Sequence, residues 1–301
     1  MRHFELSEIT GNFVEVRKYA DVKKWIAQAI EAETQKSEKS LWENELTAEQ
    51  VADLRTSTIT RLSRRARNSE ITSAIKRLAG CSRESRCCSA ACHECGRYFQ
   101  RAFVRAVDRF IRKRKNAIVE RMVSITIIPA DAKIEPNELQ NFDILNFVRR
   151  LKSKLKSANI HLGIGGVDFS FNEDKDGLYE PHWCPHIHII GWTSDVKRLR
   201  ADLKRLFPSD GAAIQRPIRV TNFDGTRYGI SYRYKITFDR RVTYYDDEKR
   251  RRKTAYPGMC SEQNVELSLY LDQVGLGSRL ILMGLKAYVR CGGLKLKYVG
   301  P

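Results

Sequence analysis

The sequence has no apolar run that approaches the roughly 18 residues of a membrane-spanning helix, so no membrane span or membrane partner is expected. Its first residues, Met1 to Glu5, lack the apolar core of a signal peptide. It contains no internal repeat and no low-complexity tract. These absences predict a cytoplasmic globular protein.

Acidic residues are in short supply. The chain has 36 Asp and Glu against 54 Lys and Arg, which gives a formal net charge of +18. The surplus is spread over most of the chain, so the expected partner is a polyanion, most simply nucleic acid. A hydrophobic content of 42% in 301 residues is enough for a sizeable core.

Cysteine is scarce except in one short stretch. Five of the eight cysteines lie between Cys81 and Cys95, and such clustering in a cytosolic protein indicates a metal more than disulfides. We predict a structural Zn²⁺ site, with Cys88 or His93 as possible replacements for Cys81 or Cys87. The predicted zinc ligands are Cys81, Cys87, Cys92 and Cys95. The isolated Cys184, Cys260 and Cys291 are expected to be ordinary small apolar residues.

A helix predicted from Gly96 to Lys115 carries two stripes at helical spacing. The apolar stripe is expected to contact the core and consists of Phe99, Phe103, Val107, Phe110 and Ile111. The basic stripe is either a solvated face or a DNA-binding face that contacts phosphates. It consists of Arg97, Arg101, Arg105, Arg109 and Arg112.

The most informative stretch is Pro185 to Ile190, in which His186 and His188 are separated and followed by isoleucines. β-Branched residues predict a strand. Side chains two apart on a strand share a face. Both imidazoles therefore point the same way, as two ligands of one metal must.

A second motif, Tyr228-x-x-x-Tyr232-x-x-Lys235, follows some forty residues later. A helix starting near Asp224 would align all three side chains along one face. A histidine pair and stacked tyrosines suggest a metal-assisted attack of a tyrosine hydroxyl on phosphorus. Tyr234 points off this stripe and is expected to pack.

The remaining patterns predict the elements around these motifs. Strands are expected at 122–128, 162–171 and 279–283, and the 162–171 strand is expected to pair antiparallel with the histidine strand. Helices are expected at 19–33, 46–54, 136–156, 195–207 and 262–274, with Pro136 near the first helical position. Residues 239–257 are expected to form a charged loop.

The order of these features resembles the HUH endonucleases. A strand with an acid, a strand with Pro-His-x-His and a helix with Tyr-x-x-Lys resemble, more narrowly, the rolling-circle replication initiators of small bacterial plasmids. Cys87-x4-Cys92-x2-Cys95 before a basic helix, and Leu269-Tyr270 followed by Arg279 to Lys286, support the narrower match. Those initiators commonly have glutamate at the position of Tyr228. Two tyrosines four apart are typical of single-stranded-phage initiators and two-tyrosine transposases.

The resemblance implies an α+β fold, in which helices flank a central antiparallel sheet behind an N-terminal helical and zinc-binding extension. We expect an N-terminal helical region at 1–80, the cysteine cluster and basic helix at 81–118, the nuclease domain at 119–290 and a tail at 291–301. The resemblance also places Asp168 beside His186 and His188 as the third ligand of a catalytic Mn²⁺ or Mg²⁺. Glu173, Glu180 and His182 are alternatives for that position.

The chemistry implied is the nicking and religation of one strand of single-stranded or cruciform origin DNA. Tyr232 is the expected nucleophile, Lys235 would favour its phenolate, and Tyr228 would serve a second transfer. The product would be a 5′-phosphotyrosine and a 3′-OH for a polymerase, with a host helicase as a further partner. The alternatives are a two-tyrosine transposase or phage initiator, and a zinc-containing DNA-binding regulator without nuclease activity.

Overall fold

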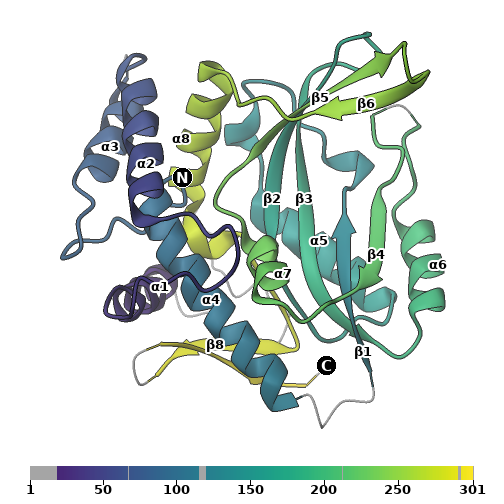
Figure 1. Cartoon of the computed structure of the whole chain (residues 1–301), viewed down its shortest axis with the longest axis horizontal. Helices are drawn as coiled ribbons and strands as arrows, with labels where there is room; N and C mark the ends of the chain where they lie inside the picture. Colours follow the sequence, from purple (N-terminus) through teal and green to yellow (C-terminus); the bar gives the residue numbers. More distant parts are fainter. Residues whose placement is uncertain (1–18, 67, 115–119, 212, 291–292, 301) are drawn as a thin grey trace.

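The computed structural model describes residues 19–66, 68–114, 120–211, 213–290 and 293–300 of an α+β chain (Figure 1). Its helices are α1 Tyr19–Thr34, α2 Ala48–Ser63, α3 Ser69–Ala79, α4 His93–Arg114, α5 Ile144–Ser157, α6 Val196–Leu206, α7 Arg227–Ser231 and α8 Ser261–Ser278, with 3-10 turns η2 Ala130–Ala132, η3 Leu139–Asn141 and η4 Tyr232–Tyr234. Its strands are β1 Arg121–Ile127, β2 Gly163–Asp174, β3 His182–Thr193, β4 Ile218–Asn222, β5 Asp239–Asp246, β6 Arg251–Ala255, β7 Leu280–Met283, β8 Leu285–Val289 and β9 Leu294–Tyr298.

The main sheet has seven strands in the order β4-β1-β3-β2-β5-β6, with β7 also paired to β2. Strands β2 and β3 pair antiparallel from Gly163 opposite Gly191 to Asn172 opposite His182, as the sequence predicts. Strand β5 runs parallel to β2. The expectation of a wholly antiparallel sheet is therefore wrong, because the chain returns to β2 after the tyrosine segment in the same direction.

The two faces of β2 and β3 meet different layers. Phe169 packs against Phe142 and Tyr270 of α8, with ring centroids 6.1 and 5.5 Å away. The opposite face carries Gly166 and Asp168 and is covered by α7, η4 and α4. Figure 1 shows α7 in front of β2 and β3, and α5 behind the strands. Because both faces are covered, every residue of β3 is buried.

The N-terminal helices pack on α4 and α8 and share the core of the sheet. A single cluster of buried side chains extends from Ile26 to Leu285. The predicted apolar stripe of α4 is confirmed as core, since all five of its side chains are buried. Phe99 and Phe103 lie 5.0 and 5.7 Å from the ring of Tyr234, so the stripe packs over the segment that carries the tyrosine motif.

Two expected elements differ in the structure. The helix expected from Pro136 begins only at Ile144, where Asp143 caps it, because Asn137 adopts a positive φ of 70° that interrupts a helix. The charged loop expected at 239–257 is instead the β5–β6 hairpin. Its sequence is unusually charged for strands, and salt bridges such as Arg240 to Glu173 and Arg252 to Asp176 tie it to β2 and the turn that follows.

No helix in the described parts of the chain combines the length and the apolar character that a membrane crossing requires.

Candidate functional site

Asp168, His186 and His188 come together on one face of the β2–β3 pair. Asp168 lies directly opposite His186 in the register, and His188 lies opposite Gly166. Asp168 Oδ2 is 3.2 Å from His186 Nε2 and 3.4 Å from His188 Nε2. The three side chains are only 2%, 6% and 4% exposed, so water does not solvate them freely.

Neighbouring groups orient both imidazoles through their Nδ1 atoms. His186 Nδ1 lies 2.9 Å from the carbonyl oxygen of Cys184, which can only accept a hydrogen bond, so this nitrogen donates. His188 Nδ1 lies 2.9 Å from Thr126 Oγ1 on β1. Such contacts at one ring nitrogen are typical of metal-binding histidines because they direct the other nitrogen toward the ion.

The three potential ligand atoms face one another, and Lys235 Nζ also contacts Asp168 Oδ2, at 2.7 Å. His188 Nε2 and Asp168 Oδ2 make no hydrogen bond of good geometry with the described residues. The lone pairs of these two atoms repel each other at 3.4 Å in a buried site unless a proton or a metal ion lies between them. Adjacent ligands of an ion at about 2.1 Å are about 3.0 Å apart in octahedral and about 3.4 Å apart in tetrahedral geometry. The triad therefore fits a small divalent metal ion.

Lys235 is the cation that contacts this site. Its Nζ lies 2.7 Å from Asp168 Oδ2 and 3.0 Å from Asp239 Oδ2. Burial alone would raise the pKa of Asp168, but Lys235 and the two imidazoles outweigh burial and hold this pKa well below its usual range. Burial lowers the pKa of His188 to about 4, so its ring is neutral and able to ligate a metal near pH 7.

The tyrosine motif lies beside the triad. The Tyr232 ring is 4.8 Å from the His188 ring, and Lys235 Nζ is 5.3 Å from the centre of the Tyr232 ring. Tyr232 is 40% and Tyr228 51% exposed, so both hydroxyls are accessible to a substrate. The expectation of one helical face for all three residues is wrong in one respect. The helix ends at Tyr234, and Lys235 is extended, which turns its side chain back to Asp168.

Tyr234 is fully buried, as predicted. Its hydroxyl donates a 2.5 Å hydrogen bond to the carbonyl of Leu276, and its ring packs between α4 and β2. This anchor fixes the position of the motif, since the residues before and after it face the site.

Gly166, which no motif of the sequence singles out, allows the segment of Arg233 and Tyr234 to pass close to β2. A Cβ at Gly166 would lie 2.7 Å from the carbonyl oxygen of Arg233, whereas one at Gly165 would lie 1.9 Å from the carbonyl oxygen of His188 on the neighbouring strand β3. Neither position tolerates a side chain without moving backbone. A glycine within a strand, here two residues before Asp168, was the available signal that another segment passes closely over it.

The alternative third ligands lie elsewhere. Glu173 forms an ion pair with Arg240, Glu180 is exposed, and His182 Nδ1 contacts the carbonyl of Glu180. None of them belongs to the group of converging ligand atoms, which contains Asp168 with the two histidines. Asp168 is thus the carboxylate that the fold brings to the histidine pair.

The predicted cysteine set also converges. The Sγ atoms of Cys81 and Cys95 are 3.5 Å apart, and Cys87–Cys95 and Cys81–Cys92 are each 3.7 Å apart. Four sulfurs at about 2.3 Å from a tetrahedral Zn²⁺ are separated by about 3.8 Å. Hydrogen bonds within the cluster lower the pKa of Cys81 and raise the pKa values of Cys92 and Cys95, so Cys81 is the thiol that loses its proton first. The cluster therefore fits one tetrahedral metal ion.

The two possible replacements do not join this cluster. The Cys88 thiol contacts the carbonyl of Arg86, and His93 is outside the converging group. Among the isolated cysteines, Cys184 is buried as expected, while Cys260 is half-buried at the N-cap of α8. Cys291 and the rest of the 291–292 segment lie outside the described residues.

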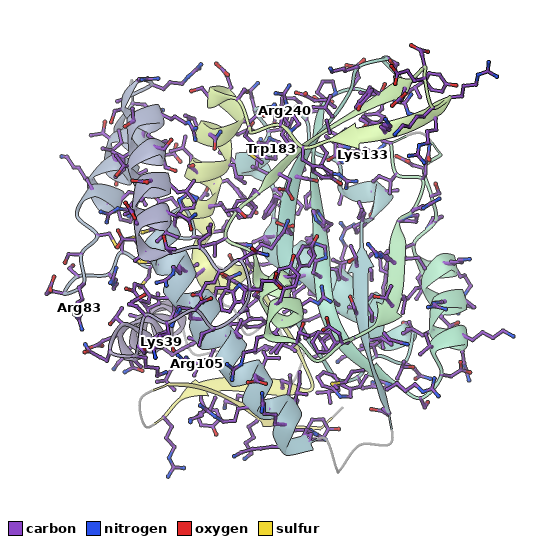
Figure 2. All side chains as sticks on the ribbon, viewed as in Figure 1. Lys39, Arg83, Arg105, Lys133, Trp183 and Arg240 are labelled. Atoms are coloured by element: carbon purple, nitrogen blue, oxygen red, sulfur yellow. The ribbon has the colours of Figure 1, made fainter. Side chains whose placement is uncertain are left out.

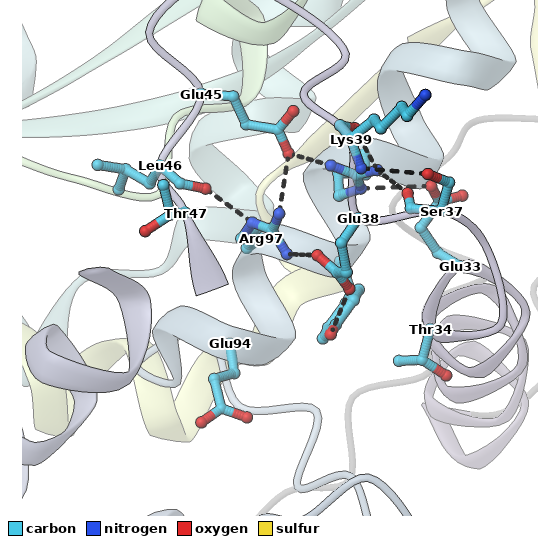
Figure 3. A network of polar contacts seen from close by, with 12 residues as sticks. Glu33, Thr34, Ser37, Glu38, Lys39, Glu45, Leu46, Thr47, Glu94 and Arg97 are labelled. Carbon is cyan, nitrogen blue, oxygen red and sulfur yellow. Dashed lines mark hydrogen bonds and ion pairs between the residues drawn. The ribbon is translucent and has the colours of Figure 1, made fainter. Parts of the chain in front are cut away.

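The basic stripe of α4 is not one exposed face, and this part of the prediction is wrong. Arg97 and Arg101 are 3% and 1% exposed. Figure 3 shows Arg97 surrounded by Glu38 and Glu45. Arg101 pairs with Glu33 and Glu45. These acids come from the end of α1 and the segment after it, some 50–70 residues upstream, and they neutralise the stripe at its N-terminal end.

The C-terminal half of the stripe remains accessible. Arg109 and Arg112 are exposed, and Arg105, labelled in Figure 2, is half-buried against Glu33. A surface hollow of about 430 Å³ lies between α4 and α7. It is lined by Arg105, Asp108, Arg109, Arg112, Lys113 and Arg227. Asp108 pairs with Arg112 and Arg227, and the other cations give the hollow a strong positive charge next to Tyr228.

No known protein family, curated protein or solved structure is detectably similar to this chain.

Proposed function

We propose that this protein is a metal-dependent tyrosine nuclease and strand transferase of the HUH type that initiates rolling-circle replication. The observation that carries the proposal is the contact between the accessible Tyr232 ring and His188, a member of a three-ligand group that fits a divalent ion. A nucleophile and an electrophilic centre side by side are the two parts that such chemistry needs.

The reaction that we infer is a transesterification. The Tyr232 oxygen forms a bond to phosphorus as its proton passes to water, and the bond from phosphorus to the 3′ oxygen breaks. That oxygen takes up a proton and becomes the 3′-OH. Asp168, His186 and His188 would hold Mn²⁺ or Mg²⁺, which neutralises charge on the phosphate. Lys235, close to the Tyr232 ring, would stabilise the phenolate.

For the cysteine cluster we propose a structural Zn²⁺. Four sulfur ligands fill a tetrahedral site and leave no position for a substrate. Cys81 follows α3, and Cys95 lies in the first turn of α4, so the ion would join these two helices. That link would fix the start of α4, whose apolar stripe packs on Tyr234.

For the DNA partner we propose that the strand passes through the cationic hollow. Arg227 directly precedes Tyr228, and Arg109 and Lys113 make no ion pair with the described carboxylates. Phosphates supply most of the sequence-independent affinity for DNA, and exposed cations are suited to bind them. This assignment keeps Arg105, Arg109 and Arg112 from the predicted stripe and omits Arg97 and Arg101.

A second candidate is favoured by Tyr228. Its side chain is as accessible as that of Tyr232, and it lies one helical turn away. A second tyrosine suits a two-tyrosine transposase or a phage initiator, in which one hydroxyl accepts a strand while the other releases one. The fate of the DNA after the first cleavage distinguishes these enzymes from a plasmid initiator.

The test is incubation of the protein with single-stranded origin DNA and Mn²⁺, followed by detection of a covalent protein–DNA adduct. Tyr232→Phe should eliminate the adduct, because it removes the attacking hydroxyl and keeps the ring. Tyr228→Phe is the matched control, which should spare this adduct and impair the second transfer that closes a circle.

An adduct that persists in the Tyr232→Phe, Tyr228→Phe double variant would refute the mechanism. Loss of the adduct in Tyr228→Phe alone would exchange the roles of the two tyrosines. Full activity in the presence of EDTA would exclude the metal.

A further inference from the structure

Arg233 is a buried cation that forms no ion pair with the described carboxylates. The residue is only 7% exposed. One of its guanidinium nitrogens donates a 2.5 Å hydrogen bond to Ser124 Oγ, and Nε has no hydrogen-bond partner among the described residues. The group lies 5.7 and 5.9 Å from the ring centres of Tyr232 and Phe223. Burial lowers its pKa to about 10, although the negative charge of Asp224 opposes this shift from outside ion-pair distance.

The other buried arginines among the described residues are compensated. Arg97 and Arg101 pair with glutamates. Arg279 donates to the carbonyl oxygens of Val167 and Lys235, at 3.1 and 2.7 Å. A buried cation that lacks such partners is destabilising. Among the buried arginines that the structure describes, Arg233 therefore stands out, because it has an unused donor and no ion pair.

That place is the edge of the candidate active site. Ser124 and Thr126 point to the same face of β1, and Thr126 contacts His188. The carbonyl of Arg233 rests on Gly166, opposite His188 in the register. Arg233 and Lys235 each lie within 6 Å of the Tyr232 ring. The guanidinium thus lies beside the hydroxyl-bearing ring and contacts β1 two residues before Thr126, which contacts His188.

We propose that Arg233 is an anion-binding residue for the scissile phosphodiester, with its free N–H groups donating to a nonbridging oxygen as Tyr232 attacks. A planar guanidinium suits two phosphate oxygens, and a preorganised donor in a dry site strengthens as charge develops in the transition state. The inference rests on the proposed function. It adds a cationic group that the Tyr-x-x-Lys motif does not include.

The experiment compares Arg233→Ala, Arg233→Lys and the control Arg200→Ala, which removes an arginine of α6 that donates to the carbonyl of Val220 on β4. The rate of adduct formation is measured in a single turnover with saturating single-stranded origin oligonucleotide and Mn²⁺. The dissociation constant is measured separately in the Tyr232→Phe background, where no adduct forms. Each variant is assayed with and without guanidinium ion at a concentration far below the denaturing range, and its thermal midpoint is recorded.

Arg233→Ala should slow adduct formation on the order of 10²–10³-fold, as loss of a preorganised donor does. The dissociation constant should change by only about threefold, because many other phosphate contacts remain. Added guanidinium should restore part of the rate to Arg233→Ala and leave the rate of Arg200→Ala unchanged. Arg233→Lys should be intermediate, since it keeps the charge and loses the planar fork.

An unchanged rate in Arg233→Ala, or a slow rate with a lowered thermal midpoint and no rescue by guanidinium, would overturn the inference and leave Arg233 as a stacking residue. Either result leaves the proposed function standing, provided that the wild-type protein forms the adduct. A wild-type protein that forms no adduct overturns both.

Discussion

The two candidate metal centres differ in ligand number and in what lies beside them. The cysteine cluster offers four soft sulfur ligands, and three of its residues are buried. The Asp168 triad offers two imidazoles and one carboxylate, and it touches the accessible Tyr232. A filled tetrahedral site can only hold structure together, whereas a three-ligand site leaves positions for a substrate. We therefore expect the cysteine cluster to stabilise the fold and the Asp168 triad to take part in the reaction.

The largest expected effect separates these assignments. His186→Ala or His188→Ala should reduce adduct formation by at least about 10³-fold, because the loss of a metal removes several kcal/mol of charge stabilisation. The thermal midpoint should fall less than in a variant of the cysteine cluster, because these variants lose the packing of one buried imidazole and keep the structural ion. Cys92→Ser, at the fully buried thiol, should instead lower the thermal midpoint strongly.

The reverse pattern would break the comparison. If the histidine variants unfold while Cys92→Ser remains stable and inactive, the roles of the two centres are exchanged. Cys184→Ser is the control for a buried cysteine outside the cluster, and its metal content should remain that of the wild-type protein.

Metal removal should show the same contrast. The purified protein should contain about one zinc per chain. A strong chelator that extracts it should destabilise the segment before Gly96, seen as faster amide exchange, while a brief EDTA treatment should remove only activity. Freely titrating thiols at Cys81, Cys87, Cys92 and Cys95 in a protein without zinc would contradict this prediction.

A smaller effect is expected at Lys235, which connects the triad to the tyrosine. Its ammonium is 2.7 Å from Asp168 Oδ2 and competes with a metal ion for that oxygen. Lys235→Met should therefore tighten Mn²⁺ binding, measured by calorimetry, while it slows adduct formation about 10- to 100-fold. Weaker Mn²⁺ binding would mean that Lys235 organises Asp168 as a ligand.

The smallest effect is expected in the hollow between α4 and α7, which contains none of the metal ligands. Arg109→Glu with Lys113→Glu should weaken binding of single-stranded DNA at low salt and reduce the slope of log K against log salt by about 1.4, for two lost phosphate contacts. The control is Arg198→Glu with Arg205→Glu, which changes the charge equally around Asp202 on exposed α6. Equal weakening by both pairs would indicate net charge alone, without a specific path.

Local sequence pattern predicted correctly those features that depend only on residues close together in the chain. Side chains two apart on a strand share a face whatever surrounds them, so the orientation of His186 and His188 followed from their spacing. The four clustered cysteines were also identified correctly as a set, and their sulfur atoms converge. Tyr234 was expected to pack because it lies off the stripe of Tyr228 and Tyr232, and it is fully buried.

Local sequence pattern gave wrong predictions where contacts with residues far away in the sequence determine the structure. The spacing of five arginines on one helical face predicted an exposed face that could bind DNA. In the structure, Arg97 and Arg101 are buried and form ion pairs with acids from the segment after α1. The β5–β6 hairpin looked like a loop because its strands are charged, and their carboxylate partners lie on β2 and in the turn after it. No motif pointed to Arg233, because what distinguishes it is a missing ion pair with the described carboxylates, which only the structure shows.

The sequence alone determined which side chains can act as ligands and nucleophiles, because residue type and spacing along one strand or helix fix their chemistry and common direction. Only the tertiary structure decided which of them meet. The register of β2 against β3 chose Asp168 over Glu173, Glu180 and His182. The close passage over Gly166 brought Tyr232 to His188. These contacts join segments some twenty to seventy residues apart, and packing and register, which no local pattern encodes, set them.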